Sequence, residues 1–478
     1  MMKIAFISSE VFPFVKTGGL ADVSGSLPKE ISKLGDELII ILPKYKNIDT
    51  NKFNLIPIIE DLKIPVFVGD ARIFETILPD SEIKVYLVGN EEFFNREDLY
   101  GDYSDNLERF SFFSLAVLEI LKAINWKPDI IHSNDWQTAM VPTYLKTLYD
   151  SKKFLQDTKI LFSIHNLGYQ GIFDASKYPK LGIDEKYFHH KYLEFYGKIN
   201  LLKGGLIFAD CLNTVSVRYS EEIQTPDFGF GLDGVLRQRS DDLYGILNGI
   251  DYDIWNPETD KFIWKNYTVE TIENKEFNKR ELQKSNNLPL IDQPLIGMVT
   301  RLASQKGLDL IVESIDILKE LDMQLIVIGT GDKKYESQLK KASELYPRKI
   351  GVNIDFNAKK SHQIEAGSDI FLMPSKYEPC GLNQMISLKY GTIPVVRETG
   401  GLADSIKDVD KYKNGNGFVF SDYSAIELIK TIIRAINVYK TDKERWKKIM
   451  TRSMKQDFSF KKSAKTYRNL YDKILTKY

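Results

Sequence analysis

Short apolar runs that stop at polar clusters constrain the fold of this chain more than any other feature of its sequence. Runs of strand length occupy residues 3–8, 129–135, 159–163, 295–300 and 369–373, and segments with helical spacing lie between several of them. Strands that alternate with helices form parallel sheets, and such sheets bind ligands at the carboxyl ends of their strands. The sequence therefore predicts an α/β protein in which polar residues gather at one edge of each sheet.

The length of the chain and a break in this alternation predict two domains. A chain of 478 residues exceeds what one hydrophobic core usually serves. After a polar region at residues 261–284 the alternation restarts, with strands expected at 295–300, 324–328, 352–356, 369–373, 392–396 and 417–420. We expect an N-terminal domain at residues 1–245, a second domain at 246–456, and an amphipathic helix at 457–478 that needs an apolar surface to pack on.

The charge balance and the cysteine count exclude several classes of protein. With 65 basic and 66 acidic residues the net charge is −1, so no global basic field attracts nucleic acid or an anionic membrane. Cys211 and Cys380 are the only cysteines, too few for a disulfide framework or a four-cysteine zinc site. The N-terminus lacks the pattern of a signal peptide, and no run approaches the roughly 20 apolar residues that span a bilayer. We expect a soluble, cytoplasmic protein that binds neither nucleic acid nor membrane.

Residues 374–384, Pro-Ser-Lys-Tyr-Glu-Pro-Cys-Gly-Leu-Asn-Gln, follow the apolar run at 369–373. Ser375 and Pro379 end the strand, and Gly381 is expected to open a helix. Glu378 then lies on a strand-to-helix loop at the carboxyl edge of a sheet. The unpaired amides of Cys380, Gly381 and Leu382 would point at an anion bound there. On these residues alone, an ordinary turn with a solvated glutamate is an equal alternative.

A six-residue sequence, Thr-Gly-Gly-Leu-Ala-Asp, occurs at both 17–22 and 399–404. Each copy follows a strand and opens a helix, which favours two similar α/β halves that each offer a Gly-Gly helix start to one ligand; coincidence is the alternative. Lys16 stands beside the first copy as a mobile cation. A Gly-x-Gly-x-x-Gly pattern at 229–234 does not follow a strand, so we expect a loop there and no dinucleotide site.

Charged residues near the strand ends predict a phosphate site. Arg301 and Lys306 share one loop after a strand, and a planar fork beside a point charge suits a diphosphate. Each hydrogen bond to a charged group contributes about 1.5–3 kcal/mol, enough for a few to stabilise a departing nucleoside diphosphate. Surface salt bridges are the alternative for this pair.

A metal site is the less favoured reading. Asp-x-Asp patterns at residues 251–253 and 408–410 could hold Mg²⁺, but both are expected to be solvated loops. The histidines show no metal-ligand spacing. His132, inside an apolar strand, is expected to be a satisfied core residue, whereas His165 at a strand end is the better ligand contact.

Taken together, these motifs resemble those of bacterial glycogen synthases and of the catalytic region of plant starch synthases. The resemblance covers essentially the full length of the chain. It rests on residues 16–23, 103–110, 134–136, 164–171, 247–257, 300–307, 378–384 and 399–404, in this order and spacing.

The resemblance implies a GT-B fold, in which two Rossmann-like domains face a central cleft and the C-terminal helix crosses back to the N-terminal domain. It implies a retaining transfer of glucose from ADP-glucose to the non-reducing-end 4-hydroxyl of an α-1,4-glucan such as glycogen, with no metal and no cofactor. The alternatives are a UDP-glucose-dependent glucosyltransferase of sucrose or related metabolism, and a glucan-binding protein without catalysis. The oligomeric state is left open.

The same resemblance assigns the site residues. It gives catalytic roles to Glu378, His165, Arg301 and Lys306. It gives substrate contacts to Lys16, Gly18, Gly19, Asp22, Tyr100, Asp135, Asn166, Asn248, Gly329, Cys380, Gly381, Leu382, Thr399, Gly400 and Gly401. Whether Glu378 is a nucleophile or a positioning and electrostatic group stays open from the sequence, and we favour the second because leaving-group stabilisation can support same-face attack.

Overall fold

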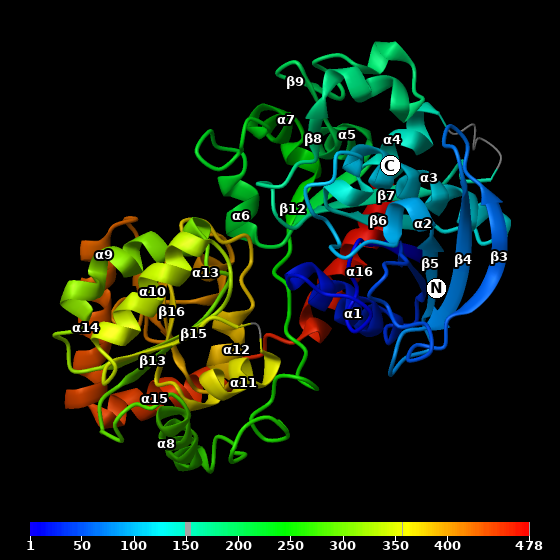
Figure 1. Ribbon diagram of the computed structural model, residues 1–478. Coiled ribbons are helices and arrows are strands. Elements are labelled where there is room, and N and C mark those ends of the chain that lie inside the picture. Colours follow the sequence, from blue (N-terminus) through cyan, green and yellow to red (C-terminus); the bar gives the residue numbers. More distant parts are fainter. Residues whose placement is uncertain (149–153, 356, 478) are drawn as a thin grey trace. The chain divides into compact units, whose positions relative to one another are not determined.

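The computed structural model describes residues 1–148, 154–355 and 357–477, and the chain divides into two compact units (Figure 1). Unit 1 comprises Met1–Gly249 and Phe460–Tyr478, and unit 2 comprises Ile250–Ser459. The boundaries between the units therefore lie at 249–250 and 459–460. The domain boundaries predicted from the sequence are 245–246 and 456–457. Two residues of expected elements, Phe356 and Tyr478, lie outside the described residues.

Unit 1 is built on a nine-stranded sheet of the described residues, in the order β12-β11-β7-β6-β1-β2-β5-β4-β3. All its neighbours pair in parallel from β12 to β5, whereas β4 and β3 are antiparallel additions at one edge. Its strands are β1 Lys3–Ile7, β2 Glu37–Pro43, β3 Ile56–Lys63, β4 Asp70–Ile77, β5 Lys84–Gly89, β6 Ile130–Asn134, β7 Lys159–Ile164, β11 Cys211–Thr214 and β12 Leu243–Gly245. A small antiparallel sheet adds β8 Ile172–Asp174, β9 Glu194–Phe195 and β10 Lys198–Asn200.

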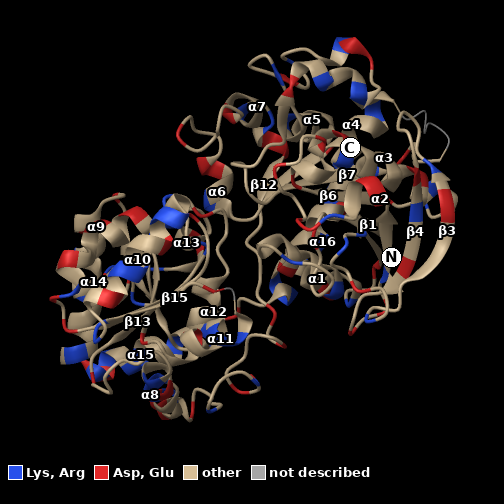
Figure 2. Cartoon of the chain, in the orientation of Figure 1, with Lys and Arg blue, Asp and Glu red and all other residues tan. Residues whose placement is uncertain are grey.

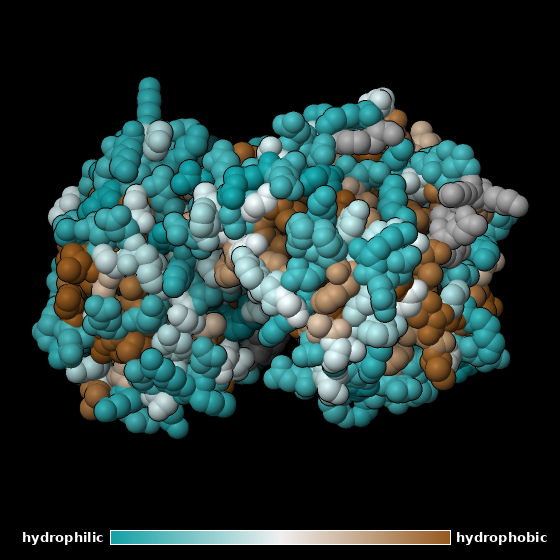
Figure 3. All heavy atoms as spheres, turned by 90° about the horizontal axis from the view of Figure 1, so that it is seen from above, coloured by the Kyte–Doolittle hydropathy of each residue, from teal (hydrophilic) through white to brown (hydrophobic). Residues whose placement is uncertain are grey.

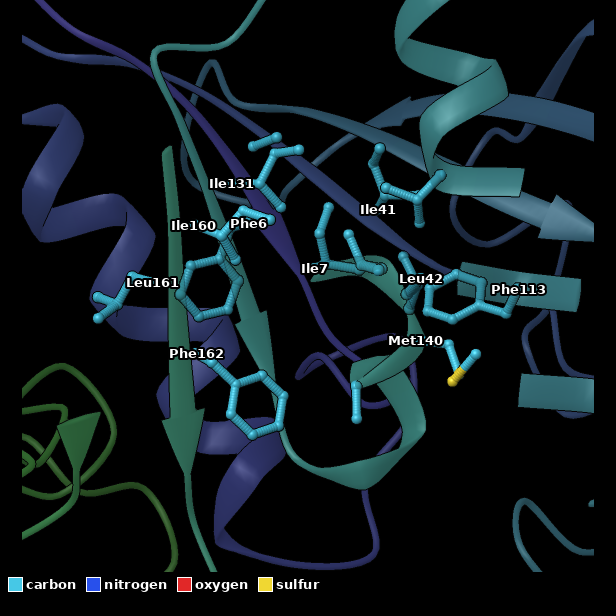
Figure 4. Packing of buried hydrophobic residues seen from close by; sticks show 14 of the residues in the cluster. Phe6, Ile7, Ile41, Leu42, Phe113, Ile131, Met140, Ile160, Leu161 and Phe162 are labelled. Atoms are coloured by element: carbon cyan, nitrogen blue, oxygen red, sulfur yellow. The ribbon is translucent and has the colours of Figure 1, made fainter. Parts of the chain in front are cut away.

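The helices of unit 1 bury the central strands. They are α1 Gly19–Ser32, α2 Glu91–Phe94, α3 Asn106–Ala123, α4 Met140–Thr147, α5 Leu201–Phe208, α6 Val217–Glu222, α7 Asp233–Gln238 and α16 Phe460–Lys477. Figure 4 shows Phe113 of α3 and Met140 of α4 gathered beside Ile7 and Leu42 from neighbouring strands. These four side chains are almost completely buried, and burying each such side chain contributes about 1.5–3 kcal/mol to folding.

The last helix of the chain, α16, belongs to unit 1, where it packs against α1 and β7. Its Tyr471 hydroxyl lies 2.8 Å from Nδ1 of His132 on β6, and Nε2 of that histidine lies 2.5 Å from Ser163 Oγ on β7. Burial lowers the pKa of His132 well below its ordinary value, so the ring stays neutral. The prediction that His132 is a satisfied core residue is confirmed.

Unit 2 contains a second sheet, entirely parallel, whose six strands in the described residues run in the order β15-β14-β13-β16-β17-β18. The strands are β13 Leu295–Val299, β14 Gln324–Ile328, β15 Ile350–Asn353, β16 Ile370–Met373, β17 Ile393–Arg397 and β18 Phe418–Phe420. The helices are α8 Lys275–Ser285, α9 Leu308–Leu318, α10 Lys333–Leu345, α11 Ala358–Gly367, α12 Asn383–Lys389, α13 Gly400–Ser405, α14 Ala425–Thr441 and α15 Lys443–Met454. The predicted α/β alternation is thus confirmed in both halves of the chain.

The distribution of charged residues along the chain agrees with its near-zero net charge. Figure 2 shows Lys and Arg interspersed with Asp and Glu on both units. The Gly-x-Gly-x-x-Gly pattern at 229–234 lies on the loop after α6 and runs into the start of α7. The element before it is a helix and not a strand, as the sequence predicts. Among the described helices we find none with the length and apolar character needed to cross a lipid bilayer.

Candidate active site

The first Gly-Gly copy forms an open helix start in unit 1. Helix α1 begins at Gly19, and Gly18 caps it in an extended conformation. A Cβ added at Gly18 would meet no atom within 4 Å, so a ligand can approach this backbone. Lys16 stands beside it, with Nζ 2.6 Å from Asp22 Oδ1 in the first turn of α1. A lysine, an acidic partner and an accessible backbone therefore occupy the place that the sequence predicts.

A buried carboxylate, Glu10, holds this loop and was not predicted. Only 3% of Glu10 is exposed, and its oxygens accept hydrogen bonds from the Thr17 amide at 2.5 Å, the Thr17 hydroxyl at 2.6 Å and the Gly18 amide at 3.2 Å. The Tyr100 hydroxyl donates to the same carboxylate at 2.5 Å. Tyr100 thus fixes the Glu10 carboxylate, which in turn holds the loop at Thr17 and Gly18. Glu10 lies three residues after the end of β1, so its position just beyond a strand end was the signal that could have found it.

The ends of β6 and β7 bring Asp135, His165 and Asn166 together. Asp135 Oδ1 accepts the backbone amide of His165 at 2.7 Å and the amide of Asn166 at 3.4 Å. His165 Nε2 lies 2.8 Å from Asn134 Oδ1, and the Asn134 amide group donates to the carbonyls of Ile7 and His132. This orientation of Asn134 assigns the proton of His165 to Nε2, because its partner is an acceptor, and leaves Nδ1 as an acceptor.

Burial changes the pKa values of both groups. It lowers the pKa of His165 to about 3, so the imidazole is neutral at physiological pH. It raises the pKa of Asp135 to about 7, against the two amide hydrogen bonds that lower it, and nearby Glu10 raises it further. A neutral imidazole and a carboxyl group that titrates near neutrality therefore stand side by side, as is common in active sites.

The Asp135 side chain should make the stability of unit 1 depend on pH. An unfolded aspartate titrates near 3.9, so its proton is held more tightly in the folded state. The stabilisation is therefore fully present below about pH 4 and is lost as the pH rises through about 7. Asp135→Asn keeps an acceptor oxygen but cannot ionise. Relative to the parent, the variant should gain about 3–4 kcal/mol in free energy of unfolding between pH 4 and pH 8. Urea unfolding at both pH values measures this difference, and an equal difference at the two would contradict it.

Asn248 differs from the other predicted contacts in unit 1. Its side chain is buried, with 6% exposed, and its Oδ1 has no hydrogen-bond partner among the described residues. Unpaired buried amide oxygens are uncommon. Asn248 is therefore a residue at the end of unit 1 with unused hydrogen-bonding capacity.

In unit 2 two of the predicted site residues, Lys306 and Glu378, form one ion pair. Lys306 Nζ lies 2.8 Å from Glu378 Oε1 and 2.6 Å from Oε2, and Ser375 Oγ donates to Oε2 at 2.9 Å. The side chain of Glu378 is 6% exposed and that of Lys306 is 19% exposed. The two residues come from the loops after β16 and β13, whose adjacent strands end at the same edge. The alternative of an ordinary turn with a solvated Glu378 is thus excluded.

Glycines let these two loops touch. Gly307 has φ of +74°, and a Cβ there would lie 2.2 Å from the Pro374 carbonyl oxygen. Gly329, at the end of β14, similarly leaves room for Thr300, whose carbonyl oxygen would lie 1.8 Å from an added Cβ. Arg301 follows Thr300 on the exposed part of the same loop. Gly329 thereby shapes the loop that carries Arg301.

The turn after Glu378 differs in detail from the prediction. Helix α12 begins at Asn383, two residues later than the expected start at Gly381. Gly381 has φ of +68°, which favours glycine, and the Gln384 side chain donates to the carbonyls of Cys380 (2.9 Å) and Gly381 (3.1 Å). Leu382 precedes α12 without a side-chain cap. The amides at this helix start keep the position at the strand edge that the sequence predicts.

The second Gly-Gly copy is not equivalent to the first. Thr399, Gly400 and Gly401 are buried, and the Gly401 amide donates to the carbonyls of Glu378 at 3.1 Å and Pro379 at 3.2 Å. A Cβ on Gly400 would lie 2.0 Å from the Glu378 carbonyl oxygen. The prediction of a second open helix start is wrong because this copy packs beneath the Glu378 turn, which occupies the Gly401 amide.

The two Asp-x-Asp patterns also differ from each other. Asp408 is 2% exposed and pairs with Arg434 at 2.9 Å, so the expectation of a solvated loop is wrong at Asp408, whereas Asp410 is exposed as expected. Asp410 pairs with Arg434 and Arg445. Guanidinium groups thus already compensate these carboxylates. Within residues 1–148, 154–355 and 357–477, no group of three or more His, Cys, Asp or Glu residues is arranged to hold a metal ion.

Comparisons with known proteins cover the whole chain. The model of the starch synthase catalytic domain matches residues 3–238, and that of the glycosyl transferases group 1 matches residues 278–451. Glycogen synthase from Thermosipho africanus is 49% identical, with all of both chains covered. Glycogen synthase from Thermotoga maritima is 47% identical, with all of this chain and 99% of the relative covered.

Solved structures give the same result for the fold. The catalytic domain of starch synthase IV from Arabidopsis thaliana, bound to ADP and acarbose, matches with a TM-score of 0.93 and 34% identity, and each chain is fully covered. A sucrose-phosphate synthase from Thermosynechococcus elongatus matches with a TM-score of 0.62 at 16% identity, which shows a likeness of fold alone. The expected GT-B fold class is confirmed.

Proposed function

Because the chain belongs to the glycogen and starch synthase family, whose members are glucosyltransferases that elongate glucan chains, we propose that it uses ADP-glucose as donor and needs no metal. Glucose is added to the non-reducing-end 4-hydroxyl of an α-1,4-glucan with retention at the anomeric carbon. The observation that carries this proposal is the ion pair between Lys306 and Glu378. Lys306 lies on the same loop as Arg301, so that loop carries two cations.

The chemistry follows from charge. One further negative charge develops on the diphosphate as the bond to glucose breaks, and cations placed beforehand stabilise that state more than the bound donor. Lys306 and Arg301 supply such cations, and Lys16 stands at the open helix start of unit 1. In the structure the Lys306 ammonium neutralises Glu378. A bound diphosphate would compete with that carboxylate for the ammonium.

Glu378 serves as a positioning and electrostatic group in this proposal. Its carboxylate is held by Lys306 and Ser375, and its backbone carbonyl by the Gly401 amide. Such a fixed carboxylate accepts hydrogen bonds from sugar hydroxyls and stabilises positive charge at the anomeric carbon. The acceptor hydroxyl then attacks the face that the diphosphate leaves and gives its proton to the departing phosphate oxygen.

In unit 1 the neutral His165 contributes a hydrogen-bond acceptor. Its Nε2–H group donates a hydrogen bond to Asn134 Oδ1. Nδ1 can therefore accept a hydrogen bond from a sugar hydroxyl. Asp135 and Asn166 lie at the same strand ends, where they contact the glucose of the donor or the acceptor glucan. Cys211 and Cys380 are buried and form no disulfide, which suits the reducing cytoplasm in which we propose that the protein acts.

Donor choice is the direct test of this function. The protein is incubated with glycogen and either labelled ADP-glucose or labelled UDP-glucose, and incorporation into polymer is measured. Transfer should be faster from ADP-glucose. A preference for UDP-glucose would move the protein to the sucrose-type alternative, and no transfer from either donor would leave a glucan-binding protein.

Removal of divalent ions should leave turnover nearly unchanged. Lysine and arginine supply the positive charge that a metal supplies in other sugar-nucleotide enzymes, so catalysis loses nothing essential with the metal. Initial rates with ADP-glucose and glycogen are compared before and after dialysis against EDTA. Rates within twofold are expected, and a loss that Mg²⁺ or Mn²⁺ restores would refute the metal-free mechanism.

A further inference from the structure

Polar side chains are packed beneath the last helix of the chain, α16. Figure 3 shows that the face of the molecule seen from above is mainly hydrophilic, so polar side chains are ordinary on the outside. Beneath α16, by contrast, five polar side chains are each exposed by 1% or less: His132 of β6, Ser163 of β7, Asn213 of β11, and Tyr467 and Tyr471 of α16. We call these five residues the polar network. None of them is among the residues assigned to the reaction above.

The hydrogen bonds of the polar network run in one direction. The Ser163 hydroxyl donates to Asn213 Oδ1, so its oxygen accepts from His132 Nε2, at 2.5 Å. The proton of His132 is therefore on Nε2, and Nδ1 accepts from the Tyr471 hydroxyl at 2.8 Å. At the other end the Asn213 amide group donates to the Tyr467 hydroxyl at 2.9 Å. The network thus begins and ends on α16, and it fixes the orientation of the His132 ring.

Asn134 joins the polar network to the candidate site. Asn134, Ser163 and Asn213 stand opposite one another on β6, β7 and β11. Alternate residues of a strand share a face, so Asn134 lies on the same face as His132, and its amide group donates to the His132 carbonyl at 3.3 Å. Asn134 Oδ1 accepts from His165 Nε2 at 2.8 Å. One asparagine therefore contacts both histidines.

The two histidines are neutral and influence each other. Burial lowers the pKa of His132 well below its ordinary value, and the nearby His165 lowers it further. Each ring carries its proton on Nε2 and presents Nδ1 as an acceptor. That of His132 is used by Tyr471, and that of His165 is left for a ligand. A disturbance of the first ring therefore reaches the second.

Apolar packing alone could hold α16 in place. Phe460, Leu470 and Ile474 of this helix are buried in the core of unit 1. Burying polar groups costs free energy unless every group is paired, so an apolar filling would stabilise this interface more simply. Fully paired buried networks, however, impose one arrangement on the groups that they join. The polar network is thus better explained by what it positions than by stability.

We propose that Tyr471 and His132 are positioning residues for His165. Tyr471 orients the His132 ring, and His132 with Ser163 fixes the ends of β6 and β7. Asn134 then holds Nε2 of His165, so that Nδ1 can accept a hydrogen bond from a sugar hydroxyl. The last helix of the chain thereby contributes to the reaction without touching the substrate. This inference rests on the proposed function, because it takes His165 to act in glucose transfer.

The first test removes one hydroxyl. Tyr471→Phe keeps the ring but deprives His132 Nδ1 of its donor. The matched control is Tyr144→Phe, since Tyr144 is fully buried in α4 and its hydroxyl donates to the Leu181 carbonyl at 3.2 Å. Initial rates are measured over a range of ADP-glucose and glycogen concentrations.

Tyr471→Phe should lower kcat roughly fivefold to tenfold with little change in either KM, whereas Tyr144→Phe should keep parental turnover. The melting temperatures of the two variants should fall alike, which removes stability as the explanation for a difference in turnover. Parental kcat in Tyr471→Phe, where His165→Ala is impaired, would overturn the proposal. So would an equal loss of kcat in the Tyr144→Phe control.

A double variant distinguishes positioning from a general loosening of the fold. Where His165→Ala has already removed the positioned group, Tyr471→Phe should lower kcat no further. A purely structural role predicts the same fractional loss of kcat in both backgrounds, and that result would refute the proposal.

A spectroscopic measurement needs no turnover. Nuclear magnetic resonance of the protein with isotope-labelled histidine reports which ring nitrogen carries the proton. In the parent, His132 and His165 should both be neutral with the proton on Nε2. Tyr471→Phe should shift the His165 resonances, and Tyr144→Phe should not. A proton on Nδ1 of His132, or His165 resonances that ignore Tyr471→Phe, would overturn the proposal. If these resonances respond as expected while His165→Ala keeps parental turnover, the positioning of His165 stands and only its role in the proposed function is refuted.

Discussion

Lys306→Ala should lower kcat by about 10²–10³-fold, because its ammonium stabilises charge that appears on the diphosphate as it leaves. Binding of glycogen should change far less, since the lysine contacts Glu378 and the leaving group. Turnover is measured with ADP-glucose and glycogen at saturation, and glycogen binding by gel mobility. The exposed Lys376, on the neighbouring loop, provides a matched control, and Lys376→Ala should keep parental turnover. An unchanged kcat in Lys306→Ala would remove this lysine from the mechanism.

The same substitution should also destabilise unit 2. It leaves the buried Glu378 carboxylate without its cation, which we expect to cost about 1–3 kcal/mol in free energy of unfolding. Lys306→Ala combined with Glu378→Gln removes both charges. The double variant should recover most of the lost stability but none of the lost turnover. Recovery of turnover would mean that the ion pair, and not charge at the leaving group, explains the effect of the lysine.

Glu378→Gln should lower kcat by about 10²–10³-fold with little change in overall folding, because the amide keeps the shape of the side chain but loses its charge. The exposed Glu398 gives the matched control, and Glu398→Gln should be nearly as active as the parent. Rates with ADP-glucose and glycogen measure both variants. An active Glu378→Gln enzyme would contradict the electrostatic role.

The parent protein also allows a test of covalent catalysis. Incubated with ADP-glucose and no acceptor, it should show no added glucosyl residue by intact-protein mass measurement. A stable adduct on Glu378 would make this residue a nucleophile and replace the positioning role proposed above.

Strand ends were the most predictable part of the site. Asp135 and His165 directly follow β6 and β7, and Lys16, Lys306 and Glu378 lie on the loops after β1, β13 and β16. The structure therefore places them all on loops that leave the carboxyl ends of strands. The pairing of Lys306 with Glu378 was not predictable, because it depends on β13 and β16 being neighbours in the sheet. The number of residues between the two loops does not show which strands are neighbours in the sheet.

The repeated hexapeptide at 17–22 and 399–404 gave a wrong expectation, because packing and not local sequence determines whether a helix start is open. Gly18 and Gly400 stand in the same hexapeptide, yet Gly18 faces open space and Gly400 lies against the Glu378 carbonyl. Local sequence specifies the helix start in both cases, and the neighbouring loop specifies whether that start is covered. The strands β3 and β4 were also missed, because β3 is exposed along most of its length and lacks a buried stripe.

Helix α16 has a consequence for how this protein is made. The segment that completes the packing of unit 1 is the last to be synthesised, after all of unit 2. Until Tyr467, Tyr471 and Ile474 emerge from the ribosome, the apolar surface that they cover in the finished molecule stays open to water. Unit 1 therefore stays incomplete during the translation of more than two hundred residues, and this apolar surface is exposed to aggregation for that time.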